Sequence, residues 1–455
     1  MDKEYFRSIY KKENILIYYN EKIKKNSAIG LDKISYRRFR ENLKENIDII
    51  NRKVINNTYK FTRYRQVLIS KGEEKPPRVI SIPTIRDSLV LGVLNEFLRD
   101  KYGESSISKR PQLIINYIIK VINEKDDFNN RKYDTFIKID IKSYYKSINH
   151  QILKNEFINK IDSIDIIDFI FLAINTETIS IPVKSKQNKK INRIKKINRI
   201  KKNGIPEGLS ISSSIANIYL KNIDKKYSNE SNFKYFRYVD DILILCKYKD
   251  RINIYENIKQ DLLILDLETN EKEDSGSLKE GFDYLGYRIS SDKITVRESS
   301  ILKLEQNLEK LFVEYRRSKE KNIKLLEFKL NLRITGFIYK NMKYGWMFFF
   351  SQMDDKTLLS KLDWLVKKLS KRYKLDGIID LKKFKRTKYE IDYKMHKSNY
   401  IKNFDKYNIN DKKELIEKIY KQTIISNKEE EINEIFERII YEEIKDLEKD
   451  IQPFS

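Results

Sequence analysis

The sequence predicts an α+β fold, in which short buried strands are set among longer, charged helices. Short runs rich in isoleucine, leucine and aromatic residues are typical of strands, and they lie at 67–71, 78–83, 136–141 and 236–245. The first two runs flank a polar loop, and the last run contains a turn of its own, so both are expected to form β-hairpins. Helical patterns dominate the chain before residue 60 and after about residue 298.

The remaining elements are expected in chain order after the first hairpin. The spacing predicts an amphipathic helix over 85–98, with Arg86 and Asp87 in its first turn. The same reasoning predicts helices over 143–157, 210–220 and 252–267, and a strand over 282–289. The last stretch, 427–450, is acidic and amphipathic, which is typical of either a packed terminal helix or an oligomerisation helix.

The charge of the chain indicates a polyanionic partner. Its 455 residues carry a net charge of +26, with lysine and arginine spread along most of the length. Nucleic acid is the first candidate for that partner and an anionic membrane the second. The length suggests two to four domains. The chain has no apolar leader and no apolar run long enough to cross a bilayer, so we expect a cytoplasmic protein with no membrane partner.

The scarcity of cysteine and histidine restricts the metal chemistry. A single cysteine excludes an intrachain disulfide and a cysteine-rich zinc site, and the presence of only two histidines disfavours a histidine-based site. Any metal would therefore be held by carboxylates, whose oxygen atoms suit Mg²⁺, or Mn²⁺ in its place.

Two adjacent carboxylates, Asp240 and Asp241, interrupt the apolar run at 236–245. At the turn of a buried hairpin, like charges repel each other and lose hydration, which raises at least one pKa. Bound cations would keep both groups ionised. The alternative is an ordinary solvated turn, as most Asp-Asp pairs are. Asp140 ends the strand at 136–141, and if that strand neighbours the hairpin, three carboxylates converge.

Such a convergence suits two divalent ions and phosphoryl transfer to a 3′-hydroxyl. We expect Asp140, Asp240 and the backbone carbonyl of Ile141 to provide oxygen ligands, with Asp241 as the third carboxylate.

A strongly basic segment at 184–202 contains the sequence KINRIK twice in succession. It is either a solvated insertion produced by a short duplication or a basic arm that contacts a nucleic-acid backbone. On the second interpretation the contacting residues are Lys189, Lys190, Arg193, Lys195, Lys196 and Arg199.

Four motifs occur in the order of reverse transcriptase motifs A, B, C and E. They are DIKSYY at 140–145, GIPEG at 204–208, YVDD at 238–241 and YLGY at 284–287. The chain resembles bacterial reverse transcriptases of the group II intron and retron-like lineage. The resemblance implies a right-hand polymerase fold with fingers, a palm containing an antiparallel sheet, a helical thumb and a helical C-terminal extension. The implied ranges are 1–135 for an N-terminal extension and fingers, 136–295 for the palm, 296–395 for the thumb and 396–455 for the extension.

The resemblance also implies residue roles. Asp140 and Asp240 match the metal-binding aspartates, and Asp241 matches the third active-site carboxylate. Tyr145 matches the aromatic residue that closes the sugar pocket, where its ring would exclude a ribose 2′-hydroxyl. Lys71 and Arg78 match the fingers residues that hold the incoming triphosphate.

Three further positions belong to the implied nucleotide site. Lys272 matches a lysine proposed to protonate the leaving pyrophosphate. Gly208 would let the backbone approach the nascent base pair. Glu207 departs from the family pattern, which usually has glutamine there, and this puts ordinary template handling in doubt.

Within this lineage the chain most resembles the defence-associated, abortive-infection reverse transcriptases. No second acidic constellation for an RNase H domain follows the palm, and His396 alone cannot supply a His-rich endonuclease. The resemblance implies an RNA-directed DNA polymerase with two Mg²⁺ ions, dNTPs, an RNA template and a DNA product. It also implies antiphage function, with a dedicated noncoding RNA in some members and oligomerisation or a partner protein in others.

Other functions stay open. A non-catalytic RNA-binding or splicing-helper protein is disfavoured by the intact carboxylates. An RNA-synthesising polymerase is disfavoured by Tyr145. An untemplated or protein-primed DNA polymerase of the same fold is left open by Glu207.

Overall fold

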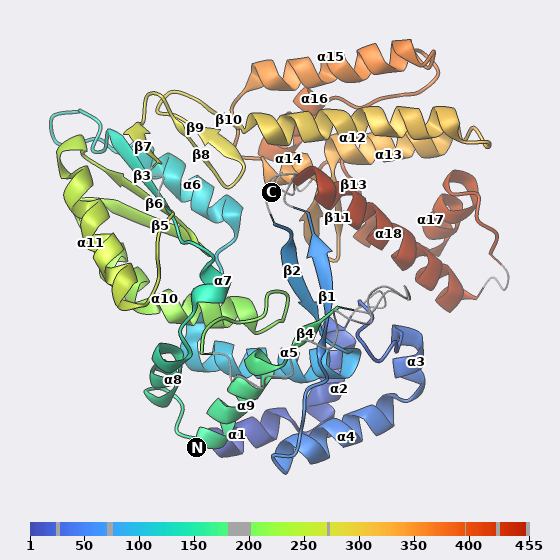
Figure 1. Cartoon of the computed structure of the whole chain (residues 1–455). Coiled ribbons are helices and arrows are strands. Elements are labelled where there is room, and N and C mark those ends of the chain that lie inside the picture. Colours follow the sequence, from blue (N-terminus) through green and yellow to red (C-terminus); the bar gives the residue numbers. More distant parts are fainter. Residues whose placement is uncertain are drawn as a thin grey trace, which may run out of the picture. The chain divides into compact units, whose positions relative to one another are not determined.

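The computed structural model describes residues 1–23, 28–70, 76–180, 202–270, 274–395, 397–424 and 428–451 (Figure 1). The chain divides into two compact units. Unit 1 comprises Met1–Arg110 and Lys132–Ser275, and unit 2 comprises Pro111–Arg131 and Gly276–Ser455.

Unit 1 combines helices with two small sheets. Its helices are α1 (Asp2–Ile9), α2 (Lys12–Lys22), α3 (Tyr36–Glu41), α4 (Leu43–Ile55), α5 (Ile85–Tyr102), α7 (Tyr144–Ser147), α8 (His150–Ile158), α9 (Ile164–Asn175), α10 (Ser212–Ser228) and α11 (Arg251–Ile264). Its strands are β1 (Tyr64–Ile69), β2 (Arg78–Ile82), β3 (Thr135–Asp140), β4 (Thr178–Ile179), β5 (Lys234–Tyr238) and β6 (Asp241–Cys246). A further strand, β7 (Asp274–Ser277), spans the division between the units.

The central sheet has the strand order β5-β6-β3-β7. Strand β6 pairs antiparallel with both β5 and β3. After its first residue, β6 is buried at every position, and it lies between β5 and β3 inside the sheet. The two strand runs predicted at 136–141 and 236–245 thus form adjacent strands of one sheet.

A second sheet has the order β2-β1-β4, and β1 and β2 form the antiparallel hairpin that the sequence predicts. Helix α5 follows this hairpin and is almost wholly buried. The Thr84 side chain accepts a hydrogen bond from the Asp87 backbone N–H, which caps the start of the helix. Asp87 in turn accepts a 2.7 Å hydrogen bond from the buried Tyr59 hydroxyl, which ties the helix to the segment before β1.

Unit 2 is mainly helical. Its helices are α6 (Pro111–Ile122), α12 (Glu298–Arg317), α13 (Ile323–Thr335), α14 (Trp346–Phe349), α15 (Lys356–Arg372), α16 (Phe384–Tyr393), α17 (Ile409–Glu414) and α18 (Glu429–Ile451). Two three-stranded sheets accompany them, formed by β8 (Phe282–Tyr284), β9 (Tyr287–Ile289), β10 (Ile294–Val296), β11 (Phe337–Tyr339), β12 (Met342–Tyr344) and β13 (Lys402–Asn403).

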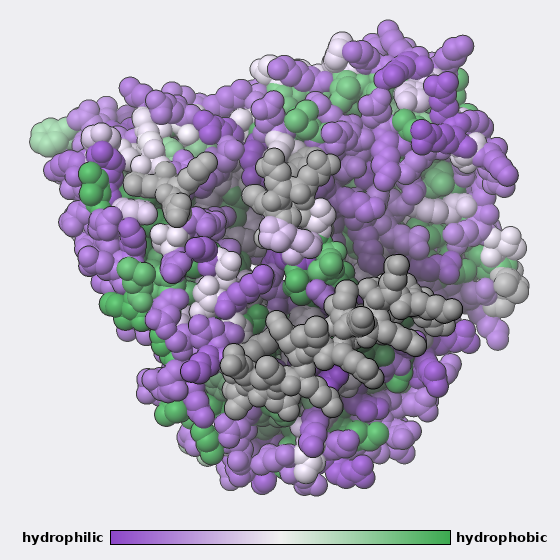
Figure 2. All heavy atoms as spheres, viewed as in Figure 1, coloured by the Kyte–Doolittle hydropathy of each residue, from purple (hydrophilic) through white to green (hydrophobic). Residues whose placement is uncertain are grey.

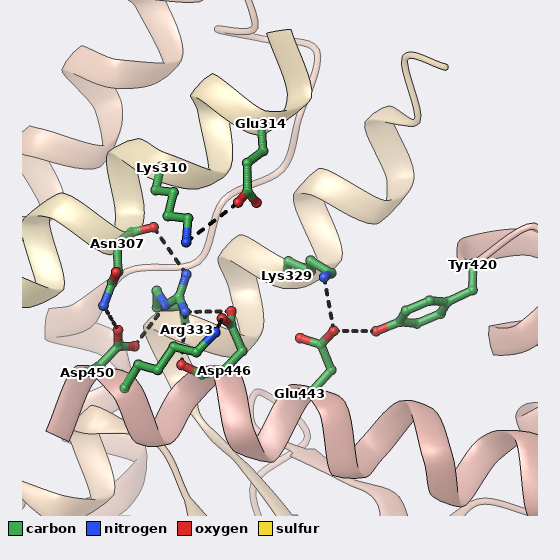
Figure 3. Close-up of polar contacts among 10 residues, drawn as sticks. Asn307, Lys310, Glu314, Lys329, Arg333, Tyr420, Glu443, Asp446 and Asp450 are labelled. Carbon is green, nitrogen blue, oxygen red and sulfur yellow. Dashed lines mark hydrogen bonds and ion pairs between the residues drawn. The ribbon is translucent and has the colours of Figure 1, made fainter. Parts of the chain in front are cut away.

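The acidic helix α18 packs into unit 2 through a hydrophobic face and a buried ionic network. Phe436, Ile440 and Leu447 lie in a core cluster that also includes residues of α13. Figure 3 shows Arg333 of α13 reaching α18, where its Nε donates to Asp450 at 2.8 Å and its Nη2 donates to Asp446 at 2.6 Å. Of the two alternatives predicted for this stretch, the structure shows a helix that packs within its own chain.

Two predicted elements differ from the structure. The helix predicted over 143–157 is two helices, α7 and α8, because the Asn149 side chain accepts the backbone N–H groups of Gln151 and Ile152 and starts a new helix. The strand predicted over 282–289 is a hairpin of β8 and β9, because Leu285 and Gly286 adopt positive φ angles of 48° and 85°. Short strands β11 to β13 also occur in a region where helical patterns dominate the sequence.

The surface is largely hydrophilic on the face seen in Figure 2, with hydrophobic residues in scattered groups. This agrees with a chain in which 35% of residues are charged. Among the helices of the described ranges, none is both long enough and apolar enough to span a bilayer.

Candidate active site

Two of the three predicted catalytic aspartates are paired on neighbouring strands of the central sheet. Asp140 is the last residue of β3 and Asp241 is the first residue of β6, and their Cα atoms are register partners. Asp240 lies in the turn between β5 and β6, and its carbonyl accepts the Ile141 N–H at 3.2 Å. The backbone therefore brings all three aspartates and Ile141 to one end of two neighbouring strands, as the sequence predicts.

The hairpin turn that carries Asp240 has an unusual backbone conformation. Val239 has a φ of 58°, although the left-handed region is disfavoured for a β-branched residue. Nη1 of Arg237 donates to the Val239 carbonyl at 2.8 Å. We infer that this contact helps hold the strained turn in place.

Arg237 is itself fixed by helix α10. Its guanidinium forms a two-point ion pair with Asp224, through Nε at 2.7 Å and through Nη2. The side chain is only 8% exposed. Burial opposes its charge, but hydrogen bonding and attraction to Asp224 outweigh burial and raise the pKa of Arg237. Arg237 therefore stays charged and links α10 to the turn of the carboxylate hairpin.

Asn270 positions the carboxylate of Asp140. Its backbone N–H donates to the Asp140 carbonyl at 2.9 Å, and its Nδ2 donates to Oδ2 of Asp140 at 2.5 Å. A backbone hydrogen bond also joins the segment before Asn270 to the residues after β3, since the Lys142 N–H donates to the Glu268 carbonyl at 2.8 Å. The loop after α11 thus runs beside the end of β3 and holds one oxygen of Asp140.

The electrostatics of the site favour a cation. Burial raises the pKa of Asp240, and the charges of Asp140 and Glu207 raise it further, whereas Arg78 lowers it. The candidate metal ligands at this end of the sheet are carboxylate and carbonyl oxygen atoms, which suit Mg²⁺ or Mn²⁺.

The side chains are not drawn into a tight metal-binding cluster. Within the ranges that the structure describes, no three His, Cys, Asp or Glu side chains lie close enough together to hold a metal ion. Like charges repel each other, and Asn270 holds the Asp140 carboxylate. Metal binding by Asp140, Ile141, Asp240 and Asp241 therefore stays a prediction.

Tyr145 lies beside the carboxylate end of the sheet. Its pKa is raised to about 12, first by burial and then by the charge of Asp240. The charge of Arg78 lowers this pKa and that of Glu207 raises it. The Tyr145 carbonyl accepts the Ile205 N–H at 2.8 Å, which fixes the ring's backbone to the turn before α10.

That turn is fitted closely against β2. The Ser81 N–H donates to the Glu207 carbonyl at 2.7 Å. Gly208 has a φ of 100°, and a Cβ atom there would lie 2.6 Å from Ile80. Glycine is therefore required at 208, by its φ and by the close approach of β2. A side-chain contact joins the same two segments, because Nε of Arg78 donates a hydrogen bond to Oε2 of Glu207.

Several predicted site residues lie outside the described residues. They are Lys71, Lys272, and the basic-arm residues Lys189, Lys190, Arg193, Lys195, Lys196 and Arg199. Their roles stay predictions.

Sequence reasoning missed Arg237, Asp224 and Asn270. Arg237 carried a usable signal, because it is a charged residue between two aromatic residues, just before the carboxylate turn. Asp224 and Asn270 carried none, because each meets its partner only through the tertiary fold.

Part of the chain matches a known protein family. Residues 69–289 match the family model of the reverse transcriptase (RNA-dependent DNA polymerase). No curated protein sequence matches the chain.

Two solved telomerase structures are similar to the chain at low levels. Apo telomerase from Candida tropicalis, truncated from its C-terminal domain, has 15% identity and a TM-score of 0.39, over 52% of this chain and 55% of that one. Telomerase from Candida albicans in complex with the TWJ fragment of telomeric RNA has 13% identity and a TM-score of 0.43, over 86% of this chain and 63% of that one. This chain spans less than two thirds of either telomerase chain.

The matched range contains Arg78, Asp140, Tyr145, Glu207 and the Asp240-Asp241 pair. The motif order, the antiparallel sheet and the family match all indicate a reverse transcriptase domain in this range. Residues 69–289 therefore match the reverse transcriptase family, whose enzymes are RNA-dependent DNA polymerases and hence nucleotidyltransferases.

Proposed function

We propose that this protein joins dNTPs to a 3′-hydroxyl at the end of strands β3 and β6, with RNA as its template. The observation that carries the proposal is the register pairing of Asp140 with Asp241, beside the turn that holds Asp240. This juxtaposition lies inside the range that matches the reverse transcriptase family.

The chain's own residues have distinct proposed tasks. Asp140, Asp240 and the Ile141 carbonyl would hold two divalent cations, with Asp241 as the third carboxylate. When bound, such cations lower the pKa of an attacking hydroxyl and neutralise charge on a leaving pyrophosphate. Arg78 would bind phosphate oxygens through its planar guanidinium, with Lys71 beside it. Lys272 would donate a proton to the pyrophosphate.

Asn270 and Arg237 act on the carboxylates rather than on substrate. Asn270 restricts the rotation of the Asp140 side chain through its hydrogen bond to Oδ2. Arg237 holds the turn that aims Asp240. We class both as positioning residues.

Tyr145 is proposed to select the sugar. Replacing Tyr145 by alanine should raise the use of rNTPs relative to dNTPs by at least about tenfold, because the space for a 2′-hydroxyl opens. Competing incorporation of dATP and ATP onto the same primer measures this ratio. Tyr145→Phe is the matched control, since it keeps the ring and should keep the ratio. An unchanged ratio in Tyr145→Ala would make the ring structural only.

The biological role is a finer proposal, supported by the motif resemblance alone. We propose a cytoplasmic, defence-associated bacterial enzyme of the group II intron and retron-like lineage that acts against phage. Its binding partners would be RNA, nascent DNA and dNTPs.

One experiment tests the polymerase proposal. The full chain is purified, co-purifying nucleic acid is sequenced, and Mg²⁺ with each dNTP is supplied with and without nuclease treatment. Product that copies an RNA sequence supports the proposal. Complete absence of DNA product, with and without added RNA template and primer, would refute it.

Untemplated DNA synthesis is a second candidate, and Glu207 favours it. The carboxylate lies beside Arg78 and Tyr145, where the family usually has a neutral glutamine. A homopolymer product that survives nuclease treatment would support this candidate over the first.

A further inference from the structure

The contact between Arg78 and Glu207 joins two parts of unit 1 that are far apart in the sequence. Arg78 is the first residue of β2, and Glu207 lies in the turn that precedes α10. Nε of Arg78 donates to Oε2 of Glu207. The Glu207 side chain is 17% exposed and that of Arg78 is 49% exposed. The carboxylate is therefore the more buried member of the pair, and the guanidinium keeps a free side toward solvent.

The position of Glu207 does not depend on the ion pair. Its carbonyl is held by the Ser81 N–H at 2.7 Å, and the next residue, Gly208, is packed against Ile80 and Ser81. The backbone alone therefore keeps Glu207 opposite β2. Arg78 can leave the carboxylate without any movement of the turn.

The charges of both members of the pair act on the carboxylate end of the sheet. The charge of Arg78 lowers the pKa of Asp240 and of Tyr145, and the charge of Glu207 raises both. The two side chains thus act on the same small region with opposite sign. A polyanion that enters this region is attracted by Arg78 and repelled by Glu207.

We propose that Glu207 is the resident counter-ion of Arg78 and that it sets the affinity of the site for the triphosphate of the incoming nucleotide. The inference rests on the proposed function. In the free enzyme, Nε of the guanidinium is bound by the carboxylate. A triphosphate competes with that carboxylate for the guanidinium, so its binding free energy is reduced by the cost of weakening the Arg78–Glu207 contact.

This exchange makes affinity depend on the charge of the ligand. A triphosphate offers several oxygens to the guanidinium and displaces a single carboxylate, whereas a monophosphate offers one charged group and competes poorly. Glu207 thereby sets how strongly a phosphate ligand must bind Arg78 before it can displace the carboxylate.

The direct test is Glu207→Gln, which removes the charge and keeps the shape. We expect the KM for dNTP to fall about fivefold, with kcat within about twofold, because a charge-assisted contact that competes with substrate is weakened. The KM of the variant staying at the wild-type value, or rising, would overturn the inference. Glu177→Gln is the matched control, since Glu177 pairs with Arg63 beside strands β1 and β4, and it should leave the KM unchanged.

The coupling through Arg78 gives a second test. In an Arg78→Ala background, Glu207→Gln should change the KM far less than in the wild type, because no guanidinium remains to compete for. The same fold-change in both backgrounds would mean that Glu207 acts on the nucleotide directly, and the inference would fail.

A binding measurement separates this inference from the polymerase proposal. Inorganic tripolyphosphate is titrated into the full chain and into Glu207→Gln by calorimetry. Tighter binding to the variant, by about fivefold, supports the inference even if no DNA is ever synthesised. Equal or weaker binding overturns it, whether or not the protein is a polymerase.

Discussion

Replacing Asp240 by asparagine is expected to abolish dNTP incorporation, by more than about a thousandfold, while the protein stays folded. The substitution keeps the shape of the side chain and removes the charge that cation binding requires. It also removes a half-buried carboxylate whose pKa is raised by burial and by the charges of Asp140 and Glu207. The melting temperature should therefore stay level or rise, since an unfavourable charge is lost.

The assay is primer extension with Mg²⁺ and dNTPs, and circular dichroism reports the fold. Asp134→Asn is the matched control. Asp134 precedes the opposite end of β3, where its Oδ1 accepts the Tyr248 N–H at 2.8 Å, and asparagine can keep that acceptor. The control should retain activity within about twofold. Substantial incorporation by Asp240→Asn, at a tenth of the wild-type rate or more, would contradict the assignment of the site.

The carboxylate hairpin was predictable from sequence because its signals are local. Alternation and apolar runs mark β3 and β6, and the aspartates stand at the ends of those runs. Once both strands are placed in one sheet, the meeting of Asp140 with Asp241 follows from antiparallel register. The pattern of a single strand does not show which strands are neighbours. The order of the motifs supplied the evidence that β3 and β6 share a sheet.

The contacts that shape the site were not predictable, because they join distant segments. Asn270 meets Asp140 across 130 positions, and its side chain is an ordinary polar residue in a loop. The break between α7 and α8 was missed because the apolar pattern continues across it, whereas the Asn149 cap interrupts the hydrogen bonding. Glu207 was recognised as unusual, but its partner, Arg78, was visible only in the fold.

The buried ionic network of unit 2 leads to the second large prediction. Arg333 is 3% exposed, and its guanidinium is bound by Asp450, by Asp446 and by the carbonyl of Asn307 (Figure 3). Asp450 is fully buried, and burial raises its pKa despite the attraction of Arg333. Replacing Arg333 by leucine would leave this carboxylate buried without its guanidinium partner.

We expect Arg333→Leu to destabilise unit 2 by about 3–5 kcal/mol, because removing one partner of a buried ion pair leaves an uncompensated charge. Hydrogen exchange of the α18 amides measures the loss, since α18 carries both aspartates. Lys310→Met, which removes the exposed Lys310–Glu314 pair of α12, is the control and should change stability by no more than about 0.5 kcal/mol.

The rescue variant tests the cause of the loss. In Arg333→Leu, the further change Asp450→Asn should recover part of the stability, because a neutral amide is cheaper to bury and can still bond Asn307. If the double variant is no more stable than Arg333→Leu alone, the loss comes from packing rather than from an unpaired charge. Protection of α18 in Arg333→Leu equal to that of the wild type would show that hydrophobic contacts such as Phe436 and Leu447 are sufficient to hold the terminal helix.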